Sequence, residues 1–365
     1  MKKLQSSARS NAVTYGIVIA AFILIQILNA TGHLSNSLRG QLVPICVYIC
    51  LAVSLNLTVG ILGELSLGHA GFMSIGAFSG IVVAMSLQSA IPSGPVRLLL
   101  AIVVGGIMAA IAGVIVGVPV LRLQGDYLAI VTLAFGEIIK NVLNNLYVGV
   151  DPNGLHMSMK DAASLNMQNG MILINGPMGA TGVTKLSTFL AGFLLILFTL
   201  FVVLNLIRSR TGRAIMAIRD NRIAAESVGL NITKYKLMAF VISAALAGMA
   251  GALYGMNYST IAPQKFDFNT SILILVFVVL GGMGNIRGSI IAAAILTILP
   301  ELLRAVNDYR MLIYAIVLIL VMLVTNNPVL KNLLDQAKDW IVKTVTIRKR
   351  LNKQLDKAEG GTDHE

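Results

Sequence analysis

Long runs of apolar residues, separated by short polar segments, set the pattern along this chain. A helix needs about 20 mostly apolar residues to cross a bilayer, and we identify ten candidate spans. The first five lie near 12–28, 42–62, 69–87, 98–120 and 127–146, and the second five near 188–207, 237–258, 271–283, 288–303 and 311–325. The pattern therefore predicts an all-α polytopic membrane protein of two five-helix halves, with residues 1–330 as a single transmembrane domain.

Composition supports a membrane protein and excludes a soluble one. Apolar residues make up 56% of the chain, charged residues only 12%, and the mean hydropathy is +0.81. Soluble domains carry about 25% charged residues, so this chain has too little charge to cover a surface facing water. The 34 glycines fit the same class, because small residues let membrane helices pack closely.

The net charge of +12 comes from basic residues that cluster in a few segments. Seven lie in 208–236 against two acidic residues, and eight lie in 331–365. This distribution is typical of the positive-inside rule rather than of a nucleic-acid surface. We therefore expect a bilayer and no nucleic acid as the environment, with 208–236, both termini and the basic tail 331–365 in the cytoplasm.

The longest polar stretch, 147–187, then lies outside the membrane. It carries few basic residues and contains turn signals at 151–154 and 175–177. We expect this external loop to form either a small cap or a mobile loop.

Segment 60–72 places glycines, a carboxylate, a hydroxyl and an imidazole between two spans. Interrupted helices in transporters bring free helix ends to a substrate path, and ionisable residues at membrane depth are functional candidates. The alternative is a tight interhelical turn at the cytoplasmic surface, in which Glu64 and His69 are merely in contact with water. The spacing alone leaves both interpretations open.

Glu137 and Lys140 lie three residues apart on one face of the fifth span. Such a pair can neutralise itself along the helix. With Asn141, Asn144 and Asn145 it makes the outer end of this span polar. The pair either lines an external vestibule or is satisfied by itself at the boundary between lipid and water.

The loop 211–230 has the spacing of a short helix. Ile215, Ile218, Arg222 and Glu226 recur at helical intervals, and Gly229 is placed to end the helix. We predict a cytoplasmic helix over 213–228. It either docks into a groove of a partner protein or lies on anionic lipid.

The sequence gives little basis for catalysis. The glycine-rich stretch 281–288 follows no strand, and the chain lacks G-x-x-x-x-G-K-[ST], H-E-x-x-H and G-x-S-x-G. We expect no enzyme activity, no metal site and no cofactor bound by this chain. A self-sufficient secondary transporter would need charges for ion coupling, for which only Glu64, His69 and Glu137 are candidates.

Several motifs, in a consistent order over about 40–325, resemble the permease subunits of ABC importers for branched-chain amino acids, specifically the M-type subunit. They are SLNL (54–57) followed by GELSLGHAGF (63–72), YLAIVTL (127–133), GRA (212–214), RD (219–220), AAE (224–226) with Gly229, and GGMG (281–284) with Gly288. The resemblance implies a type II-like permease fold and import by alternating access. It implies the inner membrane of a prokaryote as the location. Urea or another small amide remains an alternative substrate.

The resemblance also implies roles for named residues. The substrate pathway is expected at Glu64, Ser66, Gly68, His69, Gly71 and Phe72. Coupling to a separate ATPase is expected at Arg219, Asp220, Ala224, Ala225, Glu226 and Gly229, with Ile218, Ala224 and Ala225 buried against that ATPase. Further expected partners are a second permease subunit and an external solute-binding protein, and ATP is hydrolysed by the partner subunits.

Overall fold

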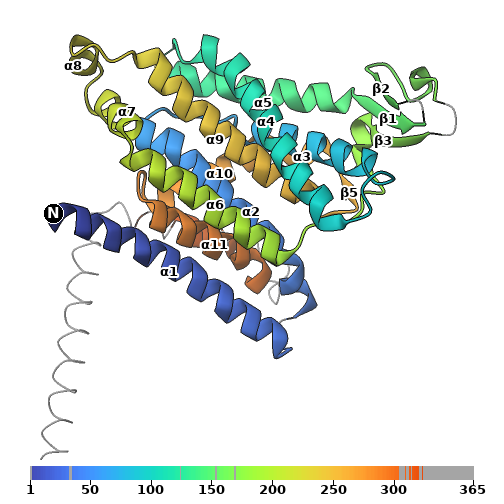
Figure 1. The fold of residues 1–365 in the computed structure, drawn as a ribbon, viewed down its shortest axis with the longest axis horizontal. Helices are drawn as coiled ribbons and strands as arrows, with labels where there is room; N and C mark the ends of the chain where they lie inside the picture. Colours follow the sequence, from blue (N-terminus) through green and yellow to red (C-terminus); the bar gives the residue numbers. More distant parts are fainter. Residues whose placement is uncertain are drawn as a thin grey trace, which may run out of the picture. The chain divides into compact units, whose positions relative to one another are not determined.

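The computed structural model describes residues 2–32, 35–123, 125–152, 154–167 and 170–303, with a few positions between 309 and 323. The chain divides into two compact units, Met1–Leu302 and Leu303–Glu365. The helices and strands named in Figure 1 lie in the first unit. About half of the positions in the expected tenth span near 311–325 are described, as helix, while its other positions and the whole tail 331–365 lie outside the described residues.

The apolar segments form helices, as the pattern predicts. In the first half these are α1 (Lys2–Ala30), α2 (Asn36–Asn56) with its π-helical continuation η1 (Leu57–Leu62), α3 (His69–Ser86), α4 (Gly94–Val120) and α5 (Asp126–Asn144). In the second half they are α6 (Phe189–Arg208), α9 (Ile232–Gly255), α10 (Phe268–Gly281) and α11 (Ile286–Leu302). Within the part of the chain that the structure describes, six helices are long and apolar enough to cross a membrane. The prediction of a mostly helical polytopic membrane protein is confirmed, and the nine expected spans from 12–28 to 288–303 each coincide with a helix.

The α2–η1 helix forms the centre of this unit. Its most apolar stretch is 94% buried, and α6, α9, α10 and α11 surround it. A helix that is apolar on all sides is buried in a protein core or a membrane, in agreement with the four helices packed around this one. Asn56 on this helix is fully buried, donates to Ser289 Oγ over 2.9 Å and accepts from Gly284 N over 2.8 Å. These bonds tie α2 to the link between α10 and α11.

Helices α3, α4 and α9 approach one another through glycine. A Cβ on Gly76 of α3 would collide with the backbone of Gly248 on α9. A Cβ on Gly105 of α4 would lie 2.9 Å from Gly76 O. Small residues give membrane helices this close approach, so the three helices form one tightly packed group.

The segment between α5 and α6 forms a small antiparallel sheet with a strand that follows α9. The expectation of an all-α chain is wrong for this segment, and the cap rather than the mobile loop is found. Gly154, at φ +139°, donates to Asp151 Oδ1 over 3.0 Å and so closes the first hairpin. In the order β2-β1-β3-β4-β5 the strands are Gly154–Ser158, Tyr147–Asp151, Met171–Asn175, Ala180–Thr181 and Thr260–Ile261.

The two long connecting segments lie at opposite ends of the helices (Figure 1). Segment 208–236 forms α7 (Arg210–Asp220) and α8 (Arg222–Ser227). Asp126 at the start of α5 shares a pocket with Arg219, whereas β1 begins at Tyr147, just beyond the other end of α5. A helix of this length spans about 28 Å. We call these the α7–α8 end and the sheet end.

The glycine packing predicts that two matched glycine-to-alanine substitutions change the stability of the protein differently. Gly248→Ala should destabilise the protein by about 1–3 kcal/mol, because its Cβ would overlap Ala109 Cβ and Gly105 O. Gly16→Ala on α1 meets nothing within 4 Å and should be neutral or stabilising, since alanine favours helix by up to about 1 kcal/mol. Thermal melting of the purified protein in detergent measures both. A Gly248→Ala protein that melts with or above the wild type would contradict the close approach of the three helices.

Candidate functional site

The predicted helix over 213–228 is in fact two helices. Asn221 separates α7 from α8 because its backbone is extended, with φ −155°, and its side chain accepts from Ala224 N over 3.0 Å. Asparagine favours this N-cap position over the helix interior. Gly229 ends α8 at φ +83°, and Leu230 N donates to Ala225 O over 3.1 Å. The prediction that Gly229 ends the helix is confirmed.

The apolar side of α7 and α8 faces the chain's own helices. Ile218 and Ala225 are buried together with Ile232 at the start of α9. Ile215 is buried against Leu57, Ile61 and other residues of the α2–η1 helix. The expectation that a partner buries Ile218 and Ala225 is therefore wrong, since a helical spacing does not reveal whether the apolar face meets a partner or the same chain.

A different face of α8 is left exposed. Ile223 is 81% exposed and Val228 is 76% exposed, and Ala224 and Glu226 are exposed beside them. Large apolar side chains at the end of a protein that holds the basic loop mark a surface suited to a partner. This exposed face, Ile223, Ala224, Glu226 and Val228, is called the α8 face below.

Arg219 joins α7 to the end of the central helix. Its Nη1 donates to Gly60 O over 3.0 Å, and its Nε and Nη2 donate to Asp220 Oδ1 over 3.1 and 2.9 Å. Its alkyl stem lies on Gly63, whose φ is +80° and whose added Cβ would lie 2.6 Å from Arg219 Cγ. Only glycine fits both that backbone conformation and that contact. Arg219 thus holds the point at which the central helix ends.

Glu64, the residue after Gly63, forms an ion pair with Lys236 of α9. The side chains are only 13% and 6% exposed. Two charges removed from water in this way must remain paired, since loss of one partner leaves the other uncompensated. Both residues line a cavity of about 350 Å³ that also includes Asp126, Arg219 and Arg222. The cavity therefore brings together the start of segment 63–68, α5, α7 and α9.

The rest of the expected pathway is packed inside the helices. His69 and Ser54 share a hydrogen bond of 2.8 Å, and Phe72 is buried against Phe135 and Phe240. A Cβ on Gly68 would collide with Thr132 O, and a Cβ on Gly71 would lie 3.0 Å from the Cα of Gly136. Segment 66–72 therefore meets α5 at closest approach.

Two hydroxyl groups accept hydrogen bonds from backbone N–H groups where the chain enters α3. Leu67 N donates to Thr132 Oγ1 over 3.0 Å, and Ala70 N donates to Ser271 Oγ over 3.1 Å. Ser66 Oγ is buried without a hydrogen-bond partner among the described residues. A buried polar group without a partner is uncommon in native structures. The Ser66 hydroxyl is therefore an unsatisfied polar group within the packed contact between segment 66–72 and α5.

Sequence reasoning grouped Glu64 with 66–72, and Arg219 and Asp220 with 224–229. The structure instead places Glu64, Arg219 and Asp220 around one cavity, whose lining does not include the residues of the α8 face. Lys236 was not singled out as a functional residue. Its position at the start of an apolar span was the available signal, because a lysine buried in such a helix needs a carboxylate partner.

Comparison with known proteins gives the family. Residues 37–322 match the family model described as the permease component of the branched-chain amino acid transport system. The high-affinity branched-chain amino acid transport permease LivM of Escherichia coli K12 is 37% identical over 291 residues, which cover 76% of this chain and 66% of that protein. This chain thus spans just under two thirds of that relative's length.

More distant relatives match as well. The permease LivH of E. coli K12 is 26% identical over 287 residues, which cover 76% of this chain and 89% of LivH. The nucleoside ABC transporter permease NupC of Lactococcus lactis is 27% identical over 222 residues, covering 56% of this chain and 64% of NupC. No solved structure matches the chain. The family match extends over most of the described helices, including the cavity and the α8 face, and the chain belongs to the family of permease components of branched-chain amino acid transport systems.

Proposed function

We propose that this chain is the membrane-spanning permease subunit of an ATP-driven importer of branched-chain amino acids. The observation that carries the proposal is the link at the α7–α8 end. An exposed apolar face on α8 continues, through α7 and Arg219, into the end of the central helix. A partner that moves α8 therefore acts directly on segment 63–68. Coupling of this kind needs a contact surface and a rigid connection, and both are present.

The connection is rigid because α7 is packed on the helices that it moves. Ile215 and Ile218 are buried against η1 and the start of α9. The Glu64–Lys236 pair ties segment 63–68 to α9. A displacement of α7 would therefore shift Gly63 and α9 together, since neither can move without separating a buried charge pair.

The substrate pathway in this proposal follows segment 64–72 alongside α5. The support is the close glycine contact of Gly68 and Gly71 with α5, together with the buried hydroxyl of Ser66. A contact made by glycine backbones opens a passage when the helices separate, because no side chains fill the gap. Glu64, Ser66, Gly68, His69, Gly71 and Phe72 are the pathway residues proposed.

The proposed assembly contains further chains. Separate ATP-binding cassette subunits bind the α8 face and hydrolyse ATP, and this chain, without a G-x-x-x-x-G-K-[ST] sequence, catalyses no reaction and binds no cofactor. A second permease subunit and an external solute-binding protein complete the importer. The chain spans the inner membrane of a prokaryote ten times in two five-helix halves, with both termini in the cytoplasm.

The α8 face predicts where the ATPase binds. Ile223→Glu places a charge in an apolar contact, and we expect the affinity for the ATPase to fall at least about tenfold, equivalent to about 1.4 kcal/mol or more. Ile223→Leu is the matched control, since it keeps the apolar surface. Copurification of the ATPase with the permease measures the effect. Retention of the ATPase by Ile223→Glu at the wild-type level would show that α8 is not the docking surface.

The Arg219 contact predicts uncoupling without loss of assembly. Arg219→Lys cannot hold Gly60 O and Asp220 simultaneously through a planar fork. We expect ATP hydrolysis to continue while amino-acid uptake into proteoliposomes falls about tenfold. Arg213→Lys on the same helix is the control, because Arg213 is exposed and its guanidinium donates to the nearby Arg208 O. Equal uptake by the two variants would remove Arg219 from the coupling route.

The proposed topology predicts labelling from opposite sides. Cysteine introduced at Met159, which is 63% exposed, should react with an impermeant maleimide in intact spheroplasts. Cysteine at Ser227 should react only in inverted vesicles. The native Cys46 and Cys50 are buried, so the wild-type protein supplies an unlabelled background. Reaction of both positions from the same side would refute the topology.

A further inference from the structure

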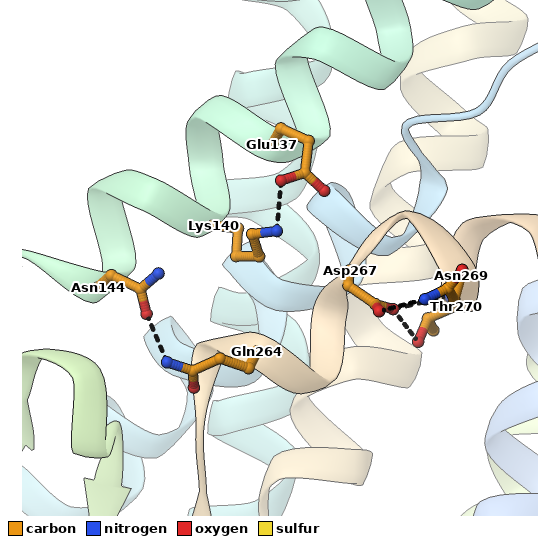
Figure 2. A network of polar contacts seen from close by, with 7 residues as sticks. All are labelled: Glu137, Lys140, Asn144, Gln264, Asp267, Asn269 and Thr270. Carbon is orange, nitrogen blue, oxygen red and sulfur yellow. Dashed lines mark hydrogen bonds and ion pairs between the residues drawn. The ribbon is translucent and has the colours of Figure 1, made fainter.

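A second group of charged residues lies toward the sheet end of α5 (Figure 2). Glu137 and Lys140 form an ion pair on this helix. Asn144, one turn further along, accepts from Gln264 Nε2 over 3.1 Å. Asp267 at the start of α10 accepts from Thr270 N and from Asn269 Nδ2, each over 2.9 Å. We call Glu137, Lys140, Asn144, Gln264 and Asp267 the outer cluster.

The outer cluster brings charges from two helices together. Partial burial raises the pKa of Asp267, but hydrogen bonds from Thr270 and Asn269 and the positive charge of Lys140 outweigh this effect and hold the pKa below its usual range. Asp267 is therefore ionised at neutral pH. Lys140 consequently faces a carboxylate on its own helix, Glu137, and the negative charge of a second helix. Figure 2 shows its amino group pointing away from α5, toward the segment that carries Asp267.

The charges are accessible rather than sealed. The side chains of Glu137 and Lys140 are 34% and 21% exposed, although they lie within one of the expected membrane spans. Ionisable groups in such a position face water or a polar cavity rather than lipid, since exposure of a charge to hydrocarbon is strongly unfavourable. The outer cluster therefore faces water or another polar environment rather than lipid hydrocarbon.

This position is directly beside the proposed pathway. Gly136, the residue before Glu137, makes the close contact with Gly71 of α3. Thr132, one turn earlier on α5, contacts Gly68. Glu137 and Lys140 thus follow this contact along α5, on the side of the sheet end.

We propose that the outer cluster receives the zwitterionic head of a free α-amino acid before the substrate passes the contact of α3 with α5. The ammonium group of the substrate binds between the carboxylates of Glu137 and Asp267. Its carboxylate binds Lys140 and the amide groups of Asn144 and Gln264. The substrate inserts between Glu137 and Lys140, so that each charge exchanges one opposite partner for another and none is left unpaired. This inference rests on the proposed import function and adds the residues that read the charged head.

The competing explanation is a purely structural ion pair on α5, and the two make different predictions for a charge swap. The experiment measures equilibrium binding of radiolabelled L-leucine to the permease–ATPase complex in detergent, without binding protein. Glu137→Gln, Lys140→Met and Asp267→Asn should each weaken leucine binding by about 10-fold to 100-fold, as expected for loss of a hydrogen bond to a charged group. Asparagine is also a good N-cap, so Asp267→Asn removes the charge while retaining the cap of α10.

The double variant Glu137→Lys with Lys140→Glu is decisive. It retains an i,i+3 pair but reverses the charges relative to Asp267, and we expect leucine binding to stay at least tenfold weaker than in the wild type. Ile138→Ala, an exposed position on the same helix, is the matched control and should bind like the wild type. Basal ATP hydrolysis and melting temperature confirm that each complex is assembled.

Two results would overturn the outer cluster as a binding site. One is wild-type leucine affinity in the swapped variant or in the three single variants, and the other is absence of leucine binding by the assembled wild-type complex. Uptake by the complete importer in proteoliposomes tests the proposed function separately. Wild-type uptake with unaltered binding in the variants would refute only this site, whereas an assembled wild type that takes up no branched-chain amino acid would refute the importer itself.

Discussion

The non-helical segment 63–68 interrupts the packed helices, and its backbone polar groups must find partners within the protein. This requirement fixes the surroundings of the segment. Thr132 on α5 accepts from Leu67 N, and Ser271 on α10 accepts from Ala70 N. The Thr132 hydroxyl can reach Leu67 N because Gly68 and Gly71 bring α3 and α5 so close. The interruption therefore determines the positions of α5 and α10, and with them the contact that we assign to the pathway.

The same segment explains the chemistry of the α7–α8 end. A carboxylate at Glu64, which is largely removed from water, requires a cation, and Lys236 supplies it from α9. A central helix that ends at a left-handed glycine leaves its last carbonyls without helical partners, and Arg219 caps that of Gly60. Both cations belong to the basic loop that positive-inside reasoning assigns to the cytoplasm. Two of the basic residues on which the expected orientation rests thus also hold the interrupted helix to α7 and α9.

Sequence reasoning located the apolar helices well because each depends on a local property, the length of an apolar run. It also located the end of α8 correctly, since a glycine after a periodic segment has a local cause. It failed where the outcome depends on distant residues. Arg219 meets Gly60 across 159 positions and Asn56 meets Gly284 across 228, and no spacing encodes such pairs. The expectation that a partner covers Ile218 was wrong for a related reason, because an apolar stripe indicates burial without identifying what covers it. The sheet was missed because its strands are short and one of them, β5, follows α9.

Helix α5 contributes residues to the cavity at the α7–α8 end, to the glycine contact with α3 and to the outer cluster. Its first residue, Asp126, lines the cavity beside Arg219, its middle meets Gly68 and Gly71 through Thr132 and Gly136, and its outer half carries Glu137 and Lys140. Adjacent residues of a helix differ by about 100° in direction, so Gly136 can face α3 while Glu137 faces the start of α10. A rotation of α5 that separates Gly136 from Gly71 must therefore also move Glu137 relative to Asp267. In our proposal, recognition of a charged head at the outer cluster and opening of the glycine contact are therefore coupled through one helix, whose first residue lines the cavity beside Arg219 of α7.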